Sequence, residues 1–270
     1  YMSEAGTLLP KVLDQFKLIG RPRGTRVAED AGVESMSQTL FTSTPAQAAE
    51  AVAAALAEGM SAESIAEAIS LTANQLVLRD SGRTAGQAQP NKAIGSVHGD
   101  SIGVHASDTA HAWRNIALAS NDRNRAASLV MAGYQVARDR SARATEFLEW
   151  KPRPYAEELA ALPVRNGEEL LKDLDGAIRE KNQNLACALV HRYGESGYHA
   201  QPVFDLLLKY AISEDGALHA EKYYRTTSDE FANARPKFRW RQLISLARVT
   251  ASECGQPAPG YQQACELLKV

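Results

Sequence analysis

Histidines and aspartates gather in one short stretch of the chain, residues 96–111, which reads Ser-Val-His-Gly-Asp-Ser-Ile-Gly-Val-His-Ala-Ser-Asp-Thr-Ala-His. His105, Asp108 and His111 recur every three residues, so on a helix they would form one slanting polar stripe. His98 and Asp100 precede the stripe and could fold over it. Neutral imidazole nitrogens and carboxylate oxygens are the ligands that iron, manganese and zinc use in proteins. The stretch therefore predicts a metal site.

An internal repeat adds a sixth candidate ligand. His219-Ala220 follows His105-Ala106 by 114 residues, and Leu243-Ile244 follows Leu129-Val130 by the same offset. Gly59-Met60-Ser61 matches Gly194-Glu195-Ser196 at an offset of 135, and the difference falls in the polar stretch 81–103. The pattern predicts two copies of a four-helix unit about a pseudo-twofold axis, with an insertion in the first. The predicted metal ligands are His98, Asp100, His105, Asp108, His111 and His219.

A reading without metal remains open at this point. Asp108 could form a salt bridge with Arg114, or with Lys222 at the matching place in the second copy. Three-residue steps over two turns spread the side chains by about 120° around a helix, so His105 and His111 could face different neighbours. The identities behind the repeat are also few, so chance similarity remains an alternative.

Helix caps and spacing predict the elements that would position these residues. Thr44-Pro45 starts a helix that Gly59 ends, and further helices are expected at 61–80, 104–119 and 123–138. The second half predicts helices at 168–194, 202–215, 218–232 and 236–253, and a short one from Tyr261. No bounded alternating run predicts a strand, so the fold class is all-α.

These elements suggest five parts in order along the chain. They are an N-terminal helical segment 1–43, a repeat unit 44–140 with its insertion 81–103, a linker 141–166, a second unit 167–255 and a C-terminal helix 256–270. Pro152 and Pro154 interrupt any helix near the middle of the linker. We expect the insertion to be ordered over the helix that carries His105, with Ile94, Val97 and Ile102 as apolar anchors.

Composition narrows the class of protein. A formal net charge of −2 in 270 residues gives no reason to expect nucleic acid as a partner. No apolar run reaches the roughly 18 residues that a membrane span needs. Three scattered cysteines do not form a disulfide framework, which predicts a reducing, cytoplasmic location. The chain opens Tyr1-Met2, which leaves room for an upstream segment.

Residues 54–73, around Leu-Ala-Glu-Gly-Met-Ser-Ala-Glu-Ser-Ile-Ala, resemble the helix–turn–helix of carboxymuconolactone decarboxylase and AhpD-like proteins. The catalytic cysteines of the AhpD type are absent, so this resemblance implies a helical hairpin and no chemistry.

A second resemblance covers roughly residues 44–255. The pattern His105-x-x-Asp108-x-x-His111-Ala112, with its partial copy at His219-Ala220, is similar to poorly characterised helical-repeat proteins sometimes encoded with a Rieske-type iron–sulfur module. Those proteins tend to have Asn where His111 stands here, and this chain has no Rieske Cys-x-His…Cys-x-x-His pair. The resemblance implies redox chemistry without naming a reaction.

Together these features predict a metal-dependent oxidoreductase with its site between the two halves. Iron is the first choice of metal, with zinc or manganese as alternatives, and the partners would be a small-molecule substrate and a redox partner or a second copy of the chain. The competing hypothesis is a non-catalytic helical-repeat module for binding or assembly.

Overall fold

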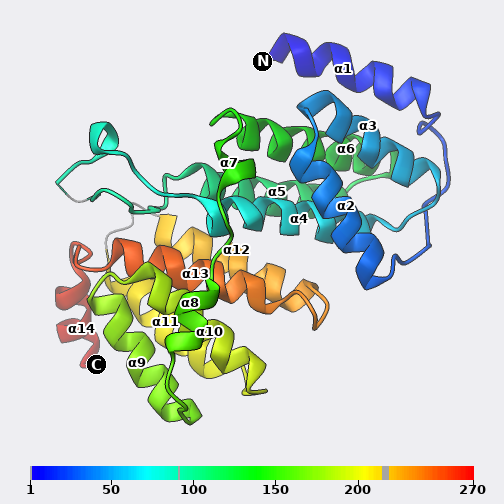
Figure 1. Cartoon of the computed structure of the whole chain (residues 1–270). Helices are drawn as coiled ribbons and strands as arrows, with labels where there is room; N and C mark the ends of the chain where they lie inside the picture. The colour runs from blue at the N-terminus through cyan, green and yellow to red at the C-terminus, as the bar shows by residue number, and fades with distance from the viewer. Residues whose placement is uncertain (1, 91, 215–218) are drawn as a thin grey trace. The chain divides into compact units, whose positions relative to one another are not determined.

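The structure is a computed structural model that describes residues 2–90, 92–214 and 219–270. Within those ranges every regular secondary-structure element is a helix (Figure 1), and β-type pairing is limited to three isolated bridges. The all-α prediction is confirmed. None of the described helices is long and apolar enough to cross a membrane.

The chain divides into two compact units. Unit 1 comprises residues up to 76 and 105–149, and unit 2 comprises residues 77–104 and 150–270. The second boundary falls at Trp150, where the prolines predicted a connection. The first falls within two helices, α4 (Ala62–Arg79) and α5 (Ile102–Ala119).

Unit 1 contains α1 (Met2–Gln15), α2 (Asp30–Thr42), α3 (Pro45–Ala57), α6 (Asp122–Ser141), α7 (Glu146–Glu149) and most of α4 and α5. Thr44 caps α3 as predicted, because its side chain accepts from the amide of Gln47 while the Gln47 side chain accepts from the amide of Thr44. Asn121 caps α6 in the same sense, accepting from the amide of Asn124.

Small residues let α3 and α6 pack closely in the core of unit 1. Ala48, Val52 and Ala53 on α3 are fully buried. A Cβ added at Gly133 on α6 would lie 2.6 Å from Cγ2 of Val52, so glycine is needed at this crossing.

Unit 2 contains α8 (Ala156–Ala161), α9 (Gly167–Arg179), α10 (Gln183–Glu195), α11 (Gln201–Ser213), α12 (His219–Asn233), α13 (Trp240–Glu253) and α14 (Tyr261–Leu268). The single helix predicted over 168–194 is wrong: α9 and α10 are separate, with Lys181 between them in a left-handed conformation at φ 58°. α13 also begins at Trp240, later than the predicted Pro236.

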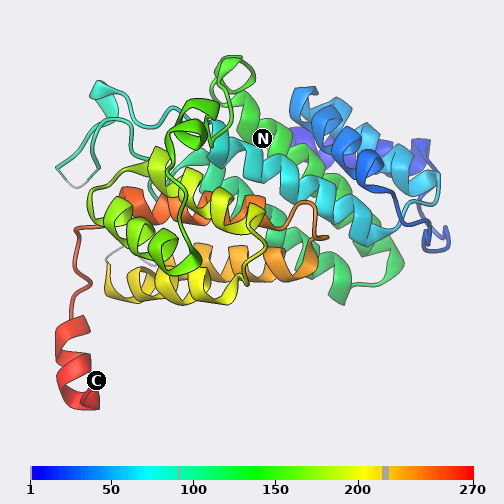
Figure 2. The ribbon, with the colours of Figure 1, turned by 60° about the horizontal axis from the view of Figure 1, so that its bottom comes forward.

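Helix α13 is the central element of unit 2, and Figure 2 shows it (orange-red) beside its neighbours. Its buried residues run around the whole helix from Gln242 to Glu253, which is typical of a helix enclosed on all sides. Apolar side chains of α9, α10, α11 and α12 pack against it, including Leu174, Leu189, Leu207 and Tyr223.

Arg248, at the middle of α13, is 0% exposed. Its guanidinium donates to the carbonyls of Val77 and Asp80 at the end of α4. Arg153 donates to the carbonyl of Asp80 as well, at 3.0 Å. Helix ends leave carbonyls without intrahelical partners, and these two arginines supply the missing donors. The chain leaves α4 from this point and enters the segment that holds the candidate site.

Candidate functional site

The site lies in unit 2, where residues 80–101, here called the loop, pack against the end of α13. The side chain of Asp80 accepts from the amide of Gly82 at 2.8 Å. The loop then pairs with itself, because the Arg83 amide donates to the Ser96 carbonyl at 3.1 Å and the Gly95 amide donates to the Arg83 carbonyl at 2.8 Å. Gly82 has a φ of +84°, and a Cβ there would lie 2.2 Å from the carbonyl oxygen of Gly95. Glycine is therefore required where the two arms of the loop meet.

Two side chains at the end of α13 bind the backbone of the loop. The amide of Val97 donates to Oγ of Ser252 at 2.8 Å, and the amide of Gly99 donates to Oε1 of Glu253 at 2.6 Å. Val97 is fully buried, as expected of an anchor, but Ile94 is 68% exposed and is not one. The predicted loop is folded in its described part, and residue 91 lies outside the described residues.

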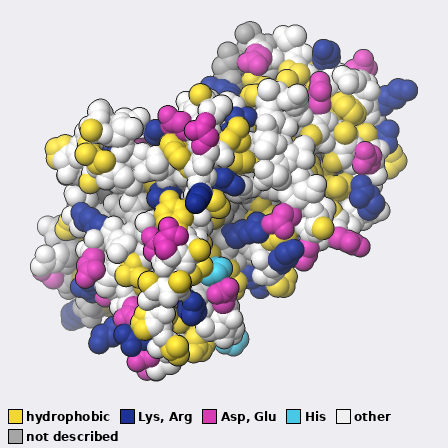
Figure 3. All heavy atoms as spheres, viewed as in Figure 1, with side chains coloured by type: hydrophobic (Ala, Val, Ile, Leu, Met, Phe, Trp, Pro, Cys, Tyr) yellow, Lys and Arg dark blue, Asp and Glu magenta, His cyan; other side chains and the backbone are white. Residues whose placement is uncertain are grey.

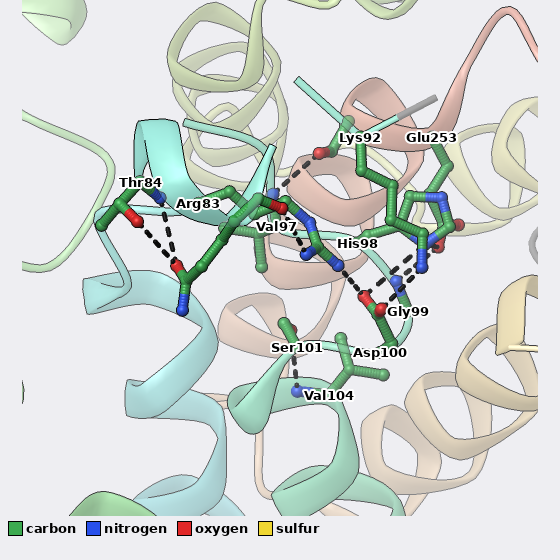
Figure 4. Close-up of polar contacts among 12 residues, drawn as sticks. Arg83, Thr84, Lys92, Val97, His98, Gly99, Asp100, Ser101, Val104 and Glu253 are labelled. Carbon is green, nitrogen blue, oxygen red and sulfur yellow. Dashed lines mark hydrogen bonds and ion pairs between the residues drawn. The ribbon is translucent and has the colours of Figure 1, made fainter. Parts of the chain in front are cut away.

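His98 and Glu253 form the most enclosed polar pair of the site (Figure 4). Nδ1 of His98 lies 3.3 Å from Oε1 of Glu253, and the two side chains are 5% and 4% exposed. Nδ1 has no hydrogen bond of good geometry among the described residues, and Oε1 accepts from the Gly99 amide. The two groups are therefore in contact at a distance that a hydrogen bond can span.

Gly99 also brings His219 to this pair. A Cβ at Gly99 would lie 2.2 Å from Cβ of His219 and 2.8 Å from Oε1 of Glu253. No residue with a side chain fits here without moving one of the two. The loop backbone thus fills the space between the start of α12 and the end of α13.

Burial disfavours charge on both members of the pair. Burial raises the pKa of Glu253 to about 8, although the Gly99 amide opposes the rise. Burial also lowers the pKa of His98 to about 4, helped by the positive charge of Lys92 and opposed by Asp100. At neutral pH these two shifts favour a protonated Glu253 beside a neutral His98.

Asp100 has a different environment, shown beside His98 in Figure 4. One carboxylate oxygen lies 2.5 Å from Nη2 of Arg83, and the other lies 2.5 Å from Nζ of Lys92. Burial opposes ionisation of Asp100, but these two cations outweigh it and lower its pKa to about 2. Asp100 is therefore a carboxylate that ties two basic side chains of the loop together.

The six predicted ligands fall into two groups. His98, Asp100 and His219 lie in unit 2 at the site just described, whereas His105, Asp108 and His111 lie on the part of α5 that belongs to unit 1. On that helix His105 is exposed and Asp108 is buried, and Nε2 of His111 lies 2.9 Å from Nδ2 of Asn115.

Two observations bear on a metal ion in unit 2. Both oxygens of Asp100 are bound to cations. In the parts of the chain that the structure describes, no group of three or more His, Cys, Asp or Glu side chains is arranged to hold an ion. The metal remains a prediction.

Sequence reasoning missed Glu253, although a signal was present. A carboxylate in the last turn of a helix is unfavourable next to the negative end of the helix dipole. Glu253 occupies that place on α13, within a run of residues that are otherwise apolar or small, Val-Thr-Ala-Ser-Glu-Cys-Gly. An acidic residue in such a position needs a specific donor, which here is the amide of Gly99.

Comparison of the chain with protein-family models, with curated proteins and with solved structures gives no match.

Proposed function

We propose that unit 2 carries an acid–base site in which Glu253 and His98 pass a proton to and from a small-molecule substrate. The observation that carries this proposal is the 3.3 Å contact between Nδ1 of His98 and Oε1 of Glu253 in surroundings that exclude water from both. General acids and bases work best when their pKa lies near the working pH, and enzymes raise a glutamate into that range by burial.

The proton count of the relay balances. A neutral His98 that accepts at Nδ1 carries its proton on Nε2, at the opposite edge of the ring. When Nε2 gives that proton to a substrate, Nδ1 takes the proton of Glu253. The product state is a glutamate anion, which the Gly99 amide stabilises through its 2.6 Å hydrogen bond. The reverse sequence makes the pair a base.

The loop provides the surroundings that such a relay needs. Arg83, Lys92 and Asp100 together carry one net positive charge beside His98. That charge favours a substrate that is anionic or that develops negative charge as it reacts.

The protonation state is the first test. Infrared spectra of the wild type at pH 7 should contain the band of a protonated carboxylic acid, and the Glu253→Gln protein should lack it. Glutamine keeps an oxygen that can accept from the Gly99 amide but has no carboxylic acid proton to transfer. An ionised Glu253 beside a protonated His98 would identify a structural ion pair and contradict the proposal.

Turnover is the second test. Small molecules that raise the melting temperature of the wild type would be tested as substrates, and turnover would be compared among variants. The relay variants are His98→Gln and Glu253→Gln. Ser252→Ala, which loses only a side chain that binds the loop backbone, is the matched control. Both relay variants should be slower by about 10²–10⁴-fold, the usual contribution of general acid–base catalysis. Equal rates in wild type and relay variants would favour the non-catalytic module that the sequence left open.

A metal-dependent oxidoreductase is a second proposal for the same place. It is supported by the proximity of two imidazole-bearing residues, His98 and His219, to the carboxylate of Glu253 around Gly99. Iron, zinc or manganese there would supply a Lewis acid or, for iron, dioxygen chemistry. Metal analysis of protein purified without added metal tests this second proposal. A bound ion that is lost in both His98→Ala and His219→Ala but kept in Ser252→Ala would support a metal site here. A metal-free wild type would contradict the metal site, and the infrared band above would then favour the proton relay.

We also infer a repeat of helical pairs, with a pseudo-twofold axis between them. The matched residues fall on consecutive helices in each half, His105 and Leu129 on α5 and α6, His219 and Leu243 on α12 and α13. Superposition of the two pairs in an experimental structure tests this, and unrelated positions for the matched residues would refute it. The three free cysteines support a reducing, cytoplasmic location, and a redox partner or a second copy of the chain stays part of the proposal.

A further inference from the structure

Unit 1 contains a cavity of about 180 Å³ that the proposed chemistry does not use. It lies where the ends of α3 and α5 meet the starts of α4 and α6 and the segment 18–24, which follows α1. Its apolar lining includes Leu18, Leu56, Met60 and Leu118. Leu118 is 52% exposed, so an apolar part of the lining is open to solvent.

The backbone makes one wall of the cavity rigid. Two backbone hydrogen bonds join Arg26 to the turn before α4. The amide of Arg26 donates to the carbonyl of Gly59 at 3.0 Å, and the amide of Ser61 donates to the carbonyl of Arg26 at 2.9 Å. A Cβ at Gly24 would lie 2.5 Å from the carbonyl oxygen of Met60. The segment 18–24 is therefore held against the turn before α4, and the cavity is a built feature.

Three arginines line the cavity, and their hydrogen bonds differ. Arg125 is fully used, donating to Asp122 and to the carbonyls of Ala117 and Ser120. Arg23 donates through Nε to Asp122 at 2.5 Å, and its side chain is 62% exposed. Within the described residues its terminal nitrogens make no hydrogen bond. The two terminal nitrogens of Arg23 thus remain for another acceptor, and a planar guanidinium edge suits a carboxylate.

The charge of the lining limits the ligand. Arg21, Arg23 and Arg125 are opposed by Glu63 and Asp122, which leaves one net positive charge. A monoanion matches this balance, whereas a dianion such as phosphate would meet the two carboxylates. A protein cavity of about 150 Å³ accommodates benzene, so this one has room for a single ring or a short branched chain.

We propose that this cavity binds a small amphipathic monocarboxylic acid, with its carboxylate on the terminal nitrogens of Arg23 and its apolar body among Leu56, Met60 and Leu118. This site is in unit 1 and does not depend on the His98–Glu253 relay. It gives the protein a second place at which a small molecule binds, of a class defined by one negative charge and one apolar group.

Benzoate is the probe for the test, with benzamide as its neutral analogue and inorganic phosphate as the dianion. Titration calorimetry or amide chemical shifts of the full chain should show saturable binding of benzoate, at least about tenfold tighter than benzamide or phosphate. Shifted amides should lie in residues 18–24 and at the starts of α4 and α6. Absence of saturable benzoate binding, or equal binding of benzamide, would overturn the proposal without any variant.

Arg23→Gln gives the second arm, with Arg26→Gln as its matched control. Arg26 lies two residues after the segment 18–24. Its side chain is similarly exposed, 52%, and forms a 3.8 Å ion pair with Glu58, but it does not line the cavity. Arg23→Gln should weaken benzoate binding by about tenfold or more, and Arg26→Gln should leave it unchanged. Equal losses in both variants would mean general attraction to positive charge and would refute the site.

Discussion

At the scale of single residues, the site depends on a position without a side chain. Gly99 lets the loop backbone contact both Glu253 and His219. Its amide donates a hydrogen bond to Glu253, which reduces the free-energy cost of burying that carboxyl group. His98 and Glu253 supply the chemistry, but Gly99 fixes their spacing.

Gly99→Ala should therefore lower the free energy of unfolding by about 1–3 kcal/mol, because the new methyl group overlaps His219 and Glu253. Chemical denaturation measures the loss. Gly86→Ala is the control within the same loop, since a Cβ there meets nothing within 4 Å, and it should change stability by less than about 0.5 kcal/mol. Similar effects of the two substitutions would show that the loop adjusts freely around position 99.

A second residue-scale prediction concerns Asp139 on α6. Burial raises the pKa of Asp139 to about 6, although a 2.8 Å hydrogen bond from Gln135 and the charge of Arg138 oppose the rise. The unfolded carboxyl has a pKa of about 3.9, so the folded state binds the proton more tightly. The contribution of Asp139 to stability is therefore fully present below about pH 4, is lost as the pH rises from about 4 to about 6, and does not change further above pH 6.

Asp139→Asn should remove this fall and raise the free energy of unfolding at pH 7 by about 1–2 kcal/mol, with little change at pH 4. Urea unfolding at the two pH values checks it. Parallel stability profiles for wild type and variant would contradict the burial effect.

At the scale of elements, arginines and caps decide where helices end. Arg248 and Arg153 bind the last carbonyls of α4 and turn the chain into the loop. Between α9 and α10, Asn182 accepts from the amide of Leu185 at 3.0 Å and starts a new helix. This cap lies in the polar run Glu-Lys-Asn-Gln-Asn at 180–184. Because the apolar spacing on both sides is helical, the sequence predicted one continuous helix across it.

Arg248→Met should cost about 2–4 kcal/mol of unfolding free energy, because two buried carbonyls lose a charged donor and methionine restores only the packing. Arg225→Met is the matched control. Arg225 is 77% exposed and pairs with Asp229 on the surface of α12, so its loss should cost less than about 0.5 kcal/mol. A small effect at Arg248 would mean that Arg153 alone satisfies the end of α4.

At the scale of the whole molecule, residues 77–104 belong with the second half of the chain, although the offset between the repeats assigned residues 81–103 to the first half as an insertion. The reason is visible in their hydrogen bonds, which go to Ser252 and Glu253 on α13 and to Gln183 on α10. On the face drawn in Figure 3, basic and acidic side chains are interspersed, in keeping with the small net charge.

The C-terminal helix α14 makes little contribution to unit 2, since none of its residues is buried. A chain ending at Pro259 keeps the hydrogen bond from the amide of Ala258 to the carbonyl of Ser213. It should unfold within about 0.5 kcal/mol of wild type, because the removed residues bury no apolar core. A larger loss in thermal or chemical unfolding would show that α14 packs more firmly than its exposure indicates.

The sequence by itself determined the helices, because their caps, glycine stops and apolar spacing are local. Thr44, Asn166 and Pro202 mark helix starts that need no distant partner. Spacing along one helix made His105, Asp108 and His111 candidates, and their position just before that helix added His98 and Asp100.

Only the tertiary structure decided which candidate residues come into contact. Glu253 lies 154 residues from Gly99 along the chain, and no local pattern encodes that contact, because it depends on how α13 is buried at the centre of unit 2. Burial also sets the charge state of the pair, since the pKa of a carboxyl or an imidazole follows the water and charges around it.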